Sequence, residues 1–101
     1  MKETIFYLNL HLKTPEGFER FGKFYIGNEA VFARNLFNKL KGTPNVDNST
    51  MLFIELMETR GGLPFNIQVI ACTLDELATN CTLITKETFK LHNLDELRTL
   101  S

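Results

Sequence analysis

Apolar and polar residues alternate along four stretches of this chain, and a short turn that contains glycine joins the stretches in two pairs. In the first pair, residues 5–13 carry Phe or Leu at every even position from 6 to 12. A period of two is the pattern of a β-strand with one buried face. The turn Thr14-Pro15-Glu16-Gly17 then leads into a second strand over residues 18–27, which buries Phe24 and Ile26. Gly22 within that strand predicts a bulge or a close approach of another chain segment.

The second pair follows the same plan. Residues 51–59 and 65–72 alternate, and the Arg60-Gly61-Gly62 turn between them is a hairpin signal. In the later strand we expect one apolar set to face the core, consisting of Phe65, Ile67, Val69 and Ala71.

A helix is predicted after each pair of strands. Asn28 is suited to the N-cap of the first helix, which should end at Gly42. Its apolar positions recur with helical spacing at Ala33, Leu36, Phe37 and Leu40. Thr73-Leu74-Asp75-Glu76 forms a capping box, so a second helix should start there. We expect its buried stripe to consist of Leu74, Leu77, Ala78 and Cys81.

The segment after Cys81 carries weaker signals. Thr85 and Asn93 are each suited to cap a further short helix, near residues 86–92 and 94–100. Leucines at 94, 97 and 100 form a spacing of three that suits a docking helix. The sequence leaves open whether residues 82–101 dock on their own chain or on a neighbour.

These elements predict one α+β domain over residues 1–101, within the usual size of a single domain. Two tandem ββα units should form a mainly antiparallel four-stranded sheet with helices on one face, plus a short C-terminal helical segment. Turn and cap landmarks recur at an offset of 45 residues, since Thr14 and Asn28 correspond to Thr59 and Thr73. A true duplication and a coincidence of similar spacing both remain open.

Charge and composition limit the partners. The formal net charge is −1, so the total charge makes nucleic acid or an anionic membrane an unlikely partner. Residues 1–7 lack the apolar core of a signal peptide, and no apolar run reaches the ~20 residues needed to cross a bilayer. We therefore expect a cytoplasmic protein in which Cys72 and Cys81 are reduced.

One segment favours nucleic acid despite the total charge. Residues 20–26 (RFGKFYI) interleave basic and aromatic side chains, and this pattern resembles the aromatic strand of RNA-recognition domains. The segment departs from that motif because Phe21 stands between Arg20 and Gly22, and because it lies in the second strand rather than the third. Single-stranded nucleic-acid binding is therefore one alternative function.

Catalytic and metal-binding signals are weak. His11, His92, Cys72 and Cys81 lack the close pairing of zinc ligands, so neither a metal nor another cofactor is expected. Glu55 lies between Phe53 and Met57 on one strand face, where a carboxylate can be desolvated. No catalytic motif accompanies it, so the sequence favours a protein that is not an enzyme. The alternative function is a small-ligand-binding protein or minor enzyme that uses a groove between the two ββα units, with Glu55, His11 and Arg60 as the candidate contacts.

The strongest functional prediction concerns association. If both helices cover one face of the sheet, the other face carries an unusually apolar set, namely Ile5, Tyr7, Phe21, Tyr25, Phe53, Met57 and Ile70. Soluble monomers seldom expose so large an apolar patch. The sequence therefore predicts a small interaction or structural domain that forms a homodimer through Tyr7, Phe21, Tyr25, Phe53 and Met57.

Overall fold

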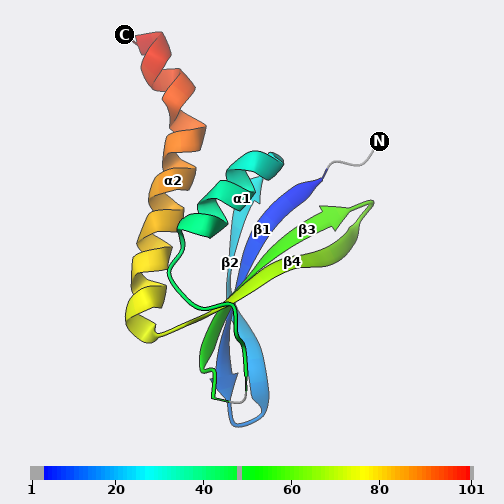
Figure 1. Ribbon diagram of the computed structural model, residues 1–101. Helices are drawn as coiled ribbons and strands as arrows, with labels where there is room; N and C mark the ends of the chain where they lie inside the picture. The colour runs from blue at the N-terminus through cyan, green and yellow to red at the C-terminus, as the bar shows by residue number, and fades with distance from the viewer. Residues whose placement is uncertain (1–3, 48, 101) are drawn as a thin grey trace.

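The computed structural model contains one four-stranded antiparallel sheet and two helices (Figure 1). It describes residues 4–47 and 49–100, and the side chains up to residue 93. Along the chain the elements are β1 (Ile5–Thr14), β2 (Gly17–Gly27), α1 (Ala30–Lys39), β3 (Leu52–Arg60), β4 (Leu63–Cys72) and α2 (Leu74–Leu100). The strands lie in the order β2-β1-β3-β4. The predicted α+β class is confirmed, and the element order is compatible with two successive strand–strand–helix units.

Both predicted hairpins are present, and glycine makes the second turn possible. Thr14 pairs with Gly17 in the first hairpin and Arg60 with Leu63 in the second. Gly61 and Gly62 both have positive φ, +56° and +84°. Two consecutive residues with positive φ are typical of the tight turn that matches the twist of paired strands, and only glycine adopts them without strain.

The bulge predicted at Gly22 is confirmed. The pairing of β1 with β2 shifts between Leu10↔Gly22 and His11↔Arg20, so Phe21 is the extra residue in β2. Arg20 and Phe21 together oppose His11.

A second irregularity lies in β4, and because of it part of the apolar set that was predicted to face the core from this strand is wrong. The pairing of β3 with β4 shifts at Leu56/Met57, which leaves Ile67 as an extra residue. Ile67 packs on the core as predicted, but Val69 and Ala71 pair with residues of the opposite face. The bulge displaces the alternation by one position, so Ile70 faces the core in their place. Phe65 is 41% exposed.

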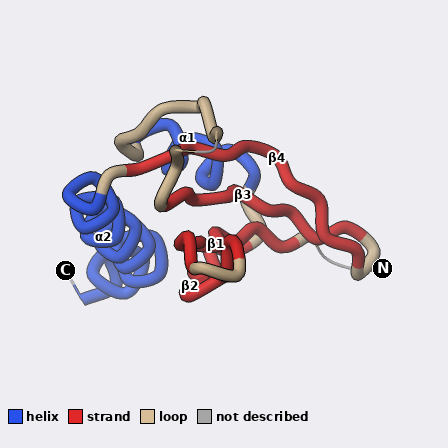
Figure 2. Tube along the Cα trace, turned by 90° about the horizontal axis from the view of Figure 1, so that it is seen from below, coloured by secondary structure: helices blue, strands red, loops and turns tan. Residues whose placement is uncertain are grey.

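The core lies between one face of the sheet and the two helices (Figure 2). β1, β2, β3 and β4 contribute apolar side chains from alternating positions, and each helix contributes one stripe. The members of the core are Phe6, Leu8, Leu10, Ile26, Ala33, Leu36, Phe37, Ile54, Leu56, Cys72, Leu77 and Ile84. The predicted stripe of α1 is confirmed, with Leu40 packed at its margin.

Helix α1 starts one residue later than predicted. Its N-cap is Glu29, in an extended conformation, and no side chain caps the helix. Asn28 was predicted from residue type alone, and the chain instead turns into the helix after Glu29.

Helix α2 is one continuous helix of 27 residues, so the predicted short helices near 86–92 and 94–100 are wrong as separate elements. Asn93, one of the two residues that suggested a break, bonds a helical carbonyl group instead: its side chain donates to the Phe89 carbonyl at 2.8 Å, four residues back. The predicted capping box is confirmed, with Thr73 and Glu76 exchanging hydrogen bonds of 2.9 and 3.1 Å. Leu77 and Cys81 face the core, but Leu74 and Ala78 are exposed.

The side chains of Leu94, Leu97 and Leu100 lie outside the described residues, so their predicted docking stays a prediction. Among the described residues, no helix combines the length and the apolar character needed to cross a membrane.

The segment that follows α1, residues 41–43, is held by contacts with α2 and with β4. The amide side chain of Asn80, fully buried on α2, accepts from the Lys41 N–H at 2.7 Å and donates to the Lys41 carbonyl at 2.8 Å. Thr43 then forms a two-way backbone bridge with Ala71 of β4, with bonds of 2.9 and 2.7 Å. Between them, Gly42 approaches the Ala71 carbonyl oxygen so closely that a Cβ there would lie 2.5 Å from it. The segment therefore closes part of the β4 edge.

Candidate functional site

The face of the sheet opposite the helices is the candidate site, and we call it the open face. Cross-strand neighbours share a face, so the register assigns its members. Rows across β2, β1 and β3 are Arg20–His11–Phe53, Lys23–Asn9–Glu55 and Tyr25–Tyr7–Met57. All five predicted interface residues lie on it or at its β2 margin, where Phe21 bulges outward, whereas Ile70 faces the core.

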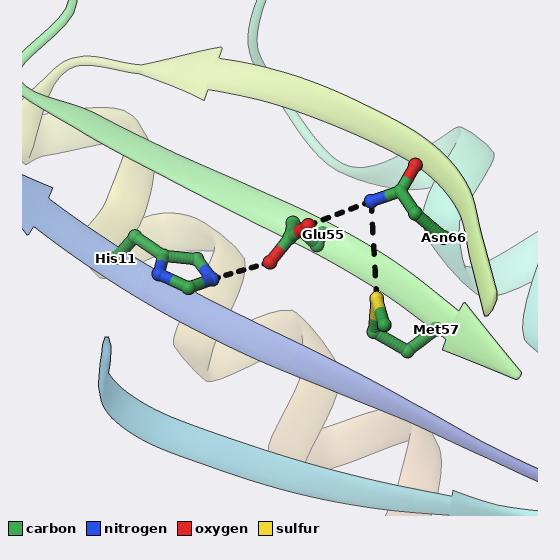
Figure 3. Close-up of polar contacts among 4 residues, drawn as sticks. All are labelled: His11, Glu55, Met57 and Asn66. Carbon is green, nitrogen blue, oxygen red and sulfur yellow. Dashed lines mark hydrogen bonds and ion pairs between the residues drawn. The ribbon is translucent and has the colours of Figure 1, made fainter. Parts of the chain in front are cut away.

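A polar cluster occupies the centre of the open face (Figure 3). His11 Nε2 is hydrogen-bonded to Glu55 Oε1. The second oxygen of Glu55 accepts from Asn66 Nδ2 at 2.7 Å, and the same amide approaches Met57 Sδ at 3.8 Å. The structure therefore brings His11 and Glu55 together as a pair, and supplies the Glu55 partners that sequence reasoning did not identify.

Stacked rings continue this cluster toward the β1–β2 turn. The His11 ring lies over Phe53 with centroids 4.4 Å apart and an angle of 14° between the planes. Phe18 meets the same Phe53 edge-on at 4.8 Å. Phe53 is therefore largely covered by its own neighbours.

A second aromatic group lies at the other end of the open face. The Lys23 ammonium group lies 4.3 Å from the centroid of Tyr7 and 4.8 Å from that of Tyr25. Both distances are within the range of cation–π attraction. Tyr7 is only 7% exposed, whereas Tyr25 is 64% exposed.

Asn9 is the unexpected member of the open face. Its side chain is 7% exposed and its Oδ1 is enclosed, yet that oxygen has no hydrogen-bond partner among the described residues. A buried polar atom without a partner is rare and is destabilising, so it requires an explanation. No sequence signal distinguishes Asn9 from any other polar residue on a strand.

Arg60 does not join the site. It lies at the β3–β4 turn, where Nε donates to Glu58 Oε2 at 2.8 Å and the guanidinium group stacks over Phe65 at 4.5 Å. Glu58 pairs with Phe6, whose side chain faces the helices, so this ion pair lies on the other side of the sheet.

The apolar part of the open face is smaller than predicted, and it is concentrated on β2. Tyr7 is buried, and Phe53 and Met57 are half-buried. The rings that remain exposed are Phe18 at 40%, Phe21 at 47% and Tyr25 at 64%.

Charges are separated between the two faces of the sheet. Lys13, Arg20 and Lys23 lie on the open face, in register with Phe18, His11 and Asn9. On β2 and β3, Glu19 and Glu58 pair with Leu12 and Phe6 and therefore point to the helix side. Among the described strand residues, Glu55 is the one carboxylate on the open face, and it is already bonded to His11 and Asn66.

A groove of about 580 Å³ lies elsewhere, between the 43–52 segment and the start of α2. Its polar groups are largely occupied: Asp47 bonds Ser49, and Glu76 belongs to the capping box. Burial raises the pKa of the Cys72 thiol on its wall to about 11, so this thiol is a poor nucleophile. No group of three or more His, Cys, Asp or Glu side chains within the described part of the chain could hold a metal ion.

The chain matches no protein-family model, and no protein of curated function or solved structure is detectably similar to it.

Proposed function

We propose that this chain is a binding domain for single-stranded nucleic acid and that the open face is its binding surface. The observation that supports this most is the alternation, along β2, of the exposed rings of Phe18, Phe21 and Tyr25 with Arg20 and Lys23. Exposed rings on a sheet stack on unpaired bases, and neighbouring cations hold the phosphates.

The spacing of the rings suits an extended strand of nucleic acid. Phe18 and Tyr25 are seven residues apart, which is ~23 Å along a β-strand. Sheet domains of the RNA-recognition type likewise stack two or three bases on exposed rings of a four-stranded sheet. Bases paired in a duplex do not offer their faces, so the preference should be for single strands.

The net charge of −1 does not oppose this proposal, because the charges lie on different surfaces. Arg20, Lys23 and Lys13 lie together on the open face, whereas acidic residues such as Glu19, Glu58 and Asp75 lie outside it. Binding is favoured over catalysis because both oxygens of Glu55 already accept hydrogen bonds.

Fluorescence anisotropy with labelled ten-nucleotide DNA and RNA, single-stranded and duplex, tests the proposal. Stacking on one ring contributes about 1–3 kcal/mol, so Tyr25→Ala should weaken binding about 5- to 150-fold. Phe65→Ala is the matched control, because Phe65 is also an exposed ring but lies outside the open face. It should leave affinity unchanged.

Salt dependence tests the cations separately. Each phosphate contact on a single strand contributes roughly −0.7 to the slope of log K against log salt concentration. Arg20→Gln and Lys23→Gln should each reduce the slope by about that amount, whereas Lys86→Gln on α2 should not. Undetectable binding at low salt, or equal losses for Tyr25→Ala and Phe65→Ala, would refute the proposal.

Self-association as a homodimer is the second candidate, and the exposure of Phe21 and Tyr25 supports it. In that case Tyr7, Phe53 and Met57 would complete the contact from the centre of the open face. Native mass spectrometry decides between one copy and two. A dimer that Tyr25→Ser/Phe53→Ser converts to a monomer would favour this candidate; a monomeric wild type would exclude it.

Two wider proposals accompany the function. A cytoplasmic location is supported by Cys72 and Cys81, which are both free thiols, as is usual in a reducing compartment. A tandem duplication of the ββα unit is supported by the parallel order of elements and by the two hairpins, which close at Thr14–Gly17 and at Arg60–Leu63. If the chain is a tandem duplication, β1 and β3 are equivalent strands, and they pair with each other at the centre of the open face.

A further inference from the structure

We propose that the open face prefers bases that carry an exocyclic amino group, and that Asn9 and Glu55 are the residues that select them. This inference rests on the proposed function, since it names which single strands the same surface prefers. It starts from the enclosed and unpartnered Oδ1 of Asn9 at the centre of that surface.

Two hydrogen-bond acceptors lie side by side at this point. Asn9 and Glu55 are direct cross-strand partners on the open face, so their side chains start about 5 Å apart. Glu55 already accepts from His11 and Asn66, but an ionised carboxylate has about four acceptor positions and can take a further donor. Asn9 Oδ1 and the Glu55 carboxylate are thus two neighbouring acceptors, and Asn9 Oδ1 has no donor bonded to it among the described residues.

An exocyclic amino group has the matching chemistry. It carries two hydrogens, one for Asn9 Oδ1 and one for the Glu55 carboxylate. Adenine and cytosine both offer such a group; asparagine is a known partner of the adenine amino group, and a carboxylate is a known partner of the cytosine amino group. Thymine and uracil instead present carbonyl oxygens beside a single N–H, and a carbonyl oxygen facing Glu55 is repelled.

Lys23 is the cross-strand partner of Asn9 on β2. The Lys23 side chain starts directly opposite Asn9 on β2 and ends over the Tyr7 and Tyr25 rings. A base that stacks on Tyr25 takes the place of the ammonium group on that ring, and a phosphate offers the ammonium group a stronger partner. Movement of this exposed side chain then uncovers Asn9 beside the stacked base.

The test compares the binding of dA10, dC10 and dT10 to the full chain by fluorescence anisotropy at one salt concentration. We expect dA10 and dC10 to bind about tenfold more tightly than dT10. Asn9→Val should lower the affinities for dA10 and dC10 to about that for dT10, because valine suits a strand but offers no acceptor oxygen. Glu55→Gln, which replaces one acceptor oxygen by a donor, should reduce the preference without altering the Asn9 position.

The outcomes separate this inference from the proposed function. Equal affinity for the three oligonucleotides overturns the selection by Asn9 and Glu55 but leaves binding through the open face intact. A preference that survives both variants also overturns it, because the selection then comes from stacking alone. Failure to bind any of the three overturns the proposed function, and the inference with it.

Discussion

Replacing Asn80 by alanine should destabilise the fold by several kcal/mol, although the substituted side chain is polar. The Asn80 side chain is fully buried and exchanges two hydrogen bonds with the backbone of Lys41, at 2.7 and 2.8 Å. It also approaches the Cys72 sulfur at 3.5 Å. It therefore joins α2 to the segment between α1 and β3.

The expected magnitude follows from these contacts. Each hydrogen bond contributes about 1 kcal/mol net, and a buried backbone group left without a partner costs about 1–3 kcal/mol. Because alanine removes both of these part-buried bonds and leaves two backbone groups of Lys41 without their protein partner, we expect a loss of about 2–4 kcal/mol. For a domain of this size, that corresponds to a melting temperature lower by about 10–25 °C.

Urea unfolding followed by circular dichroism measures the loss directly. Thr79→Ala is the control, since Thr79 is exposed on the adjacent position of the same helix and should change stability by less than about 0.5 kcal/mol. A loss below about 1 kcal/mol for Asn80→Ala would contradict the reasoning, because it would mean that the Lys41 backbone does not depend on this side chain.

Three further predictions concern packing and titration. Gly42→Ala should destabilise the protein and loosen the bridge to Ala71, since the added Cβ would lie 2.5 Å from a backbone oxygen; hydrogen exchange of the Ala71 amide measures this. The Cys72 pKa is raised to about 11 by burial, so stability should fall as pH rises from 9 to 11, and less so in Cys72→Ala. The hydrogen bond from Lys39 lowers the pKa of Glu87. The stabilisation that this contact gives to the fold should therefore be present above pH 4.5 and be lost as pH falls through the lowered pKa. NMR titration of Glu87 in the wild type and in Lys39→Met tests this expectation.

The parts of the fold that local chemistry determines were predictable from the sequence. Period-two alternation located all four strands, and Gly61-Gly62 located a turn that requires positive φ. Thr73 and Glu76 formed the expected capping box because both partners lie within one helical turn. Each of these features depends on residues close together in the chain.

The errors arose where one extra residue or one tertiary contact decides the outcome. The bulge at Ile67 reversed the faces of Val69 and Ala71, although their alternation in the sequence is unbroken. Asn93 resembled a helix cap, but a continuous helix forms and its side chain bonds a carbonyl of the preceding turn. Neither result follows from residue type, because partners elsewhere select between two locally acceptable conformations.

The sequence predicted most residues of the candidate site, but it did not predict which of them contact one another. The alternation placed His11 and Glu55 on the open face, yet only the register of β1 against β3 makes them diagonal neighbours. Arg60 was predicted to join them in a groove between the two ββα units, whereas its side chain forms an ion pair with Glu58. Asn9 was inconspicuous because its importance comes from the enclosure of its amide oxygen by other strands.

The central position of β1 determines the order in which the chain can fold. β1 pairs on one side with β2, its neighbour in sequence, and on the other side with β3, where Ile5 meets Thr59 and Leu12 meets Leu52. During synthesis from the N-terminus, the first hairpin and α1 are complete before β3 exists. One edge of β1 then remains unpaired, with apolar side chains on one face, and such an edge invites pairing with other chains. Completion of the sheet requires closure of a long loop, so β3 rather than either hairpin should limit the folding rate. A nascent chain that pauses before residue 60 would therefore be the species most prone to aggregate.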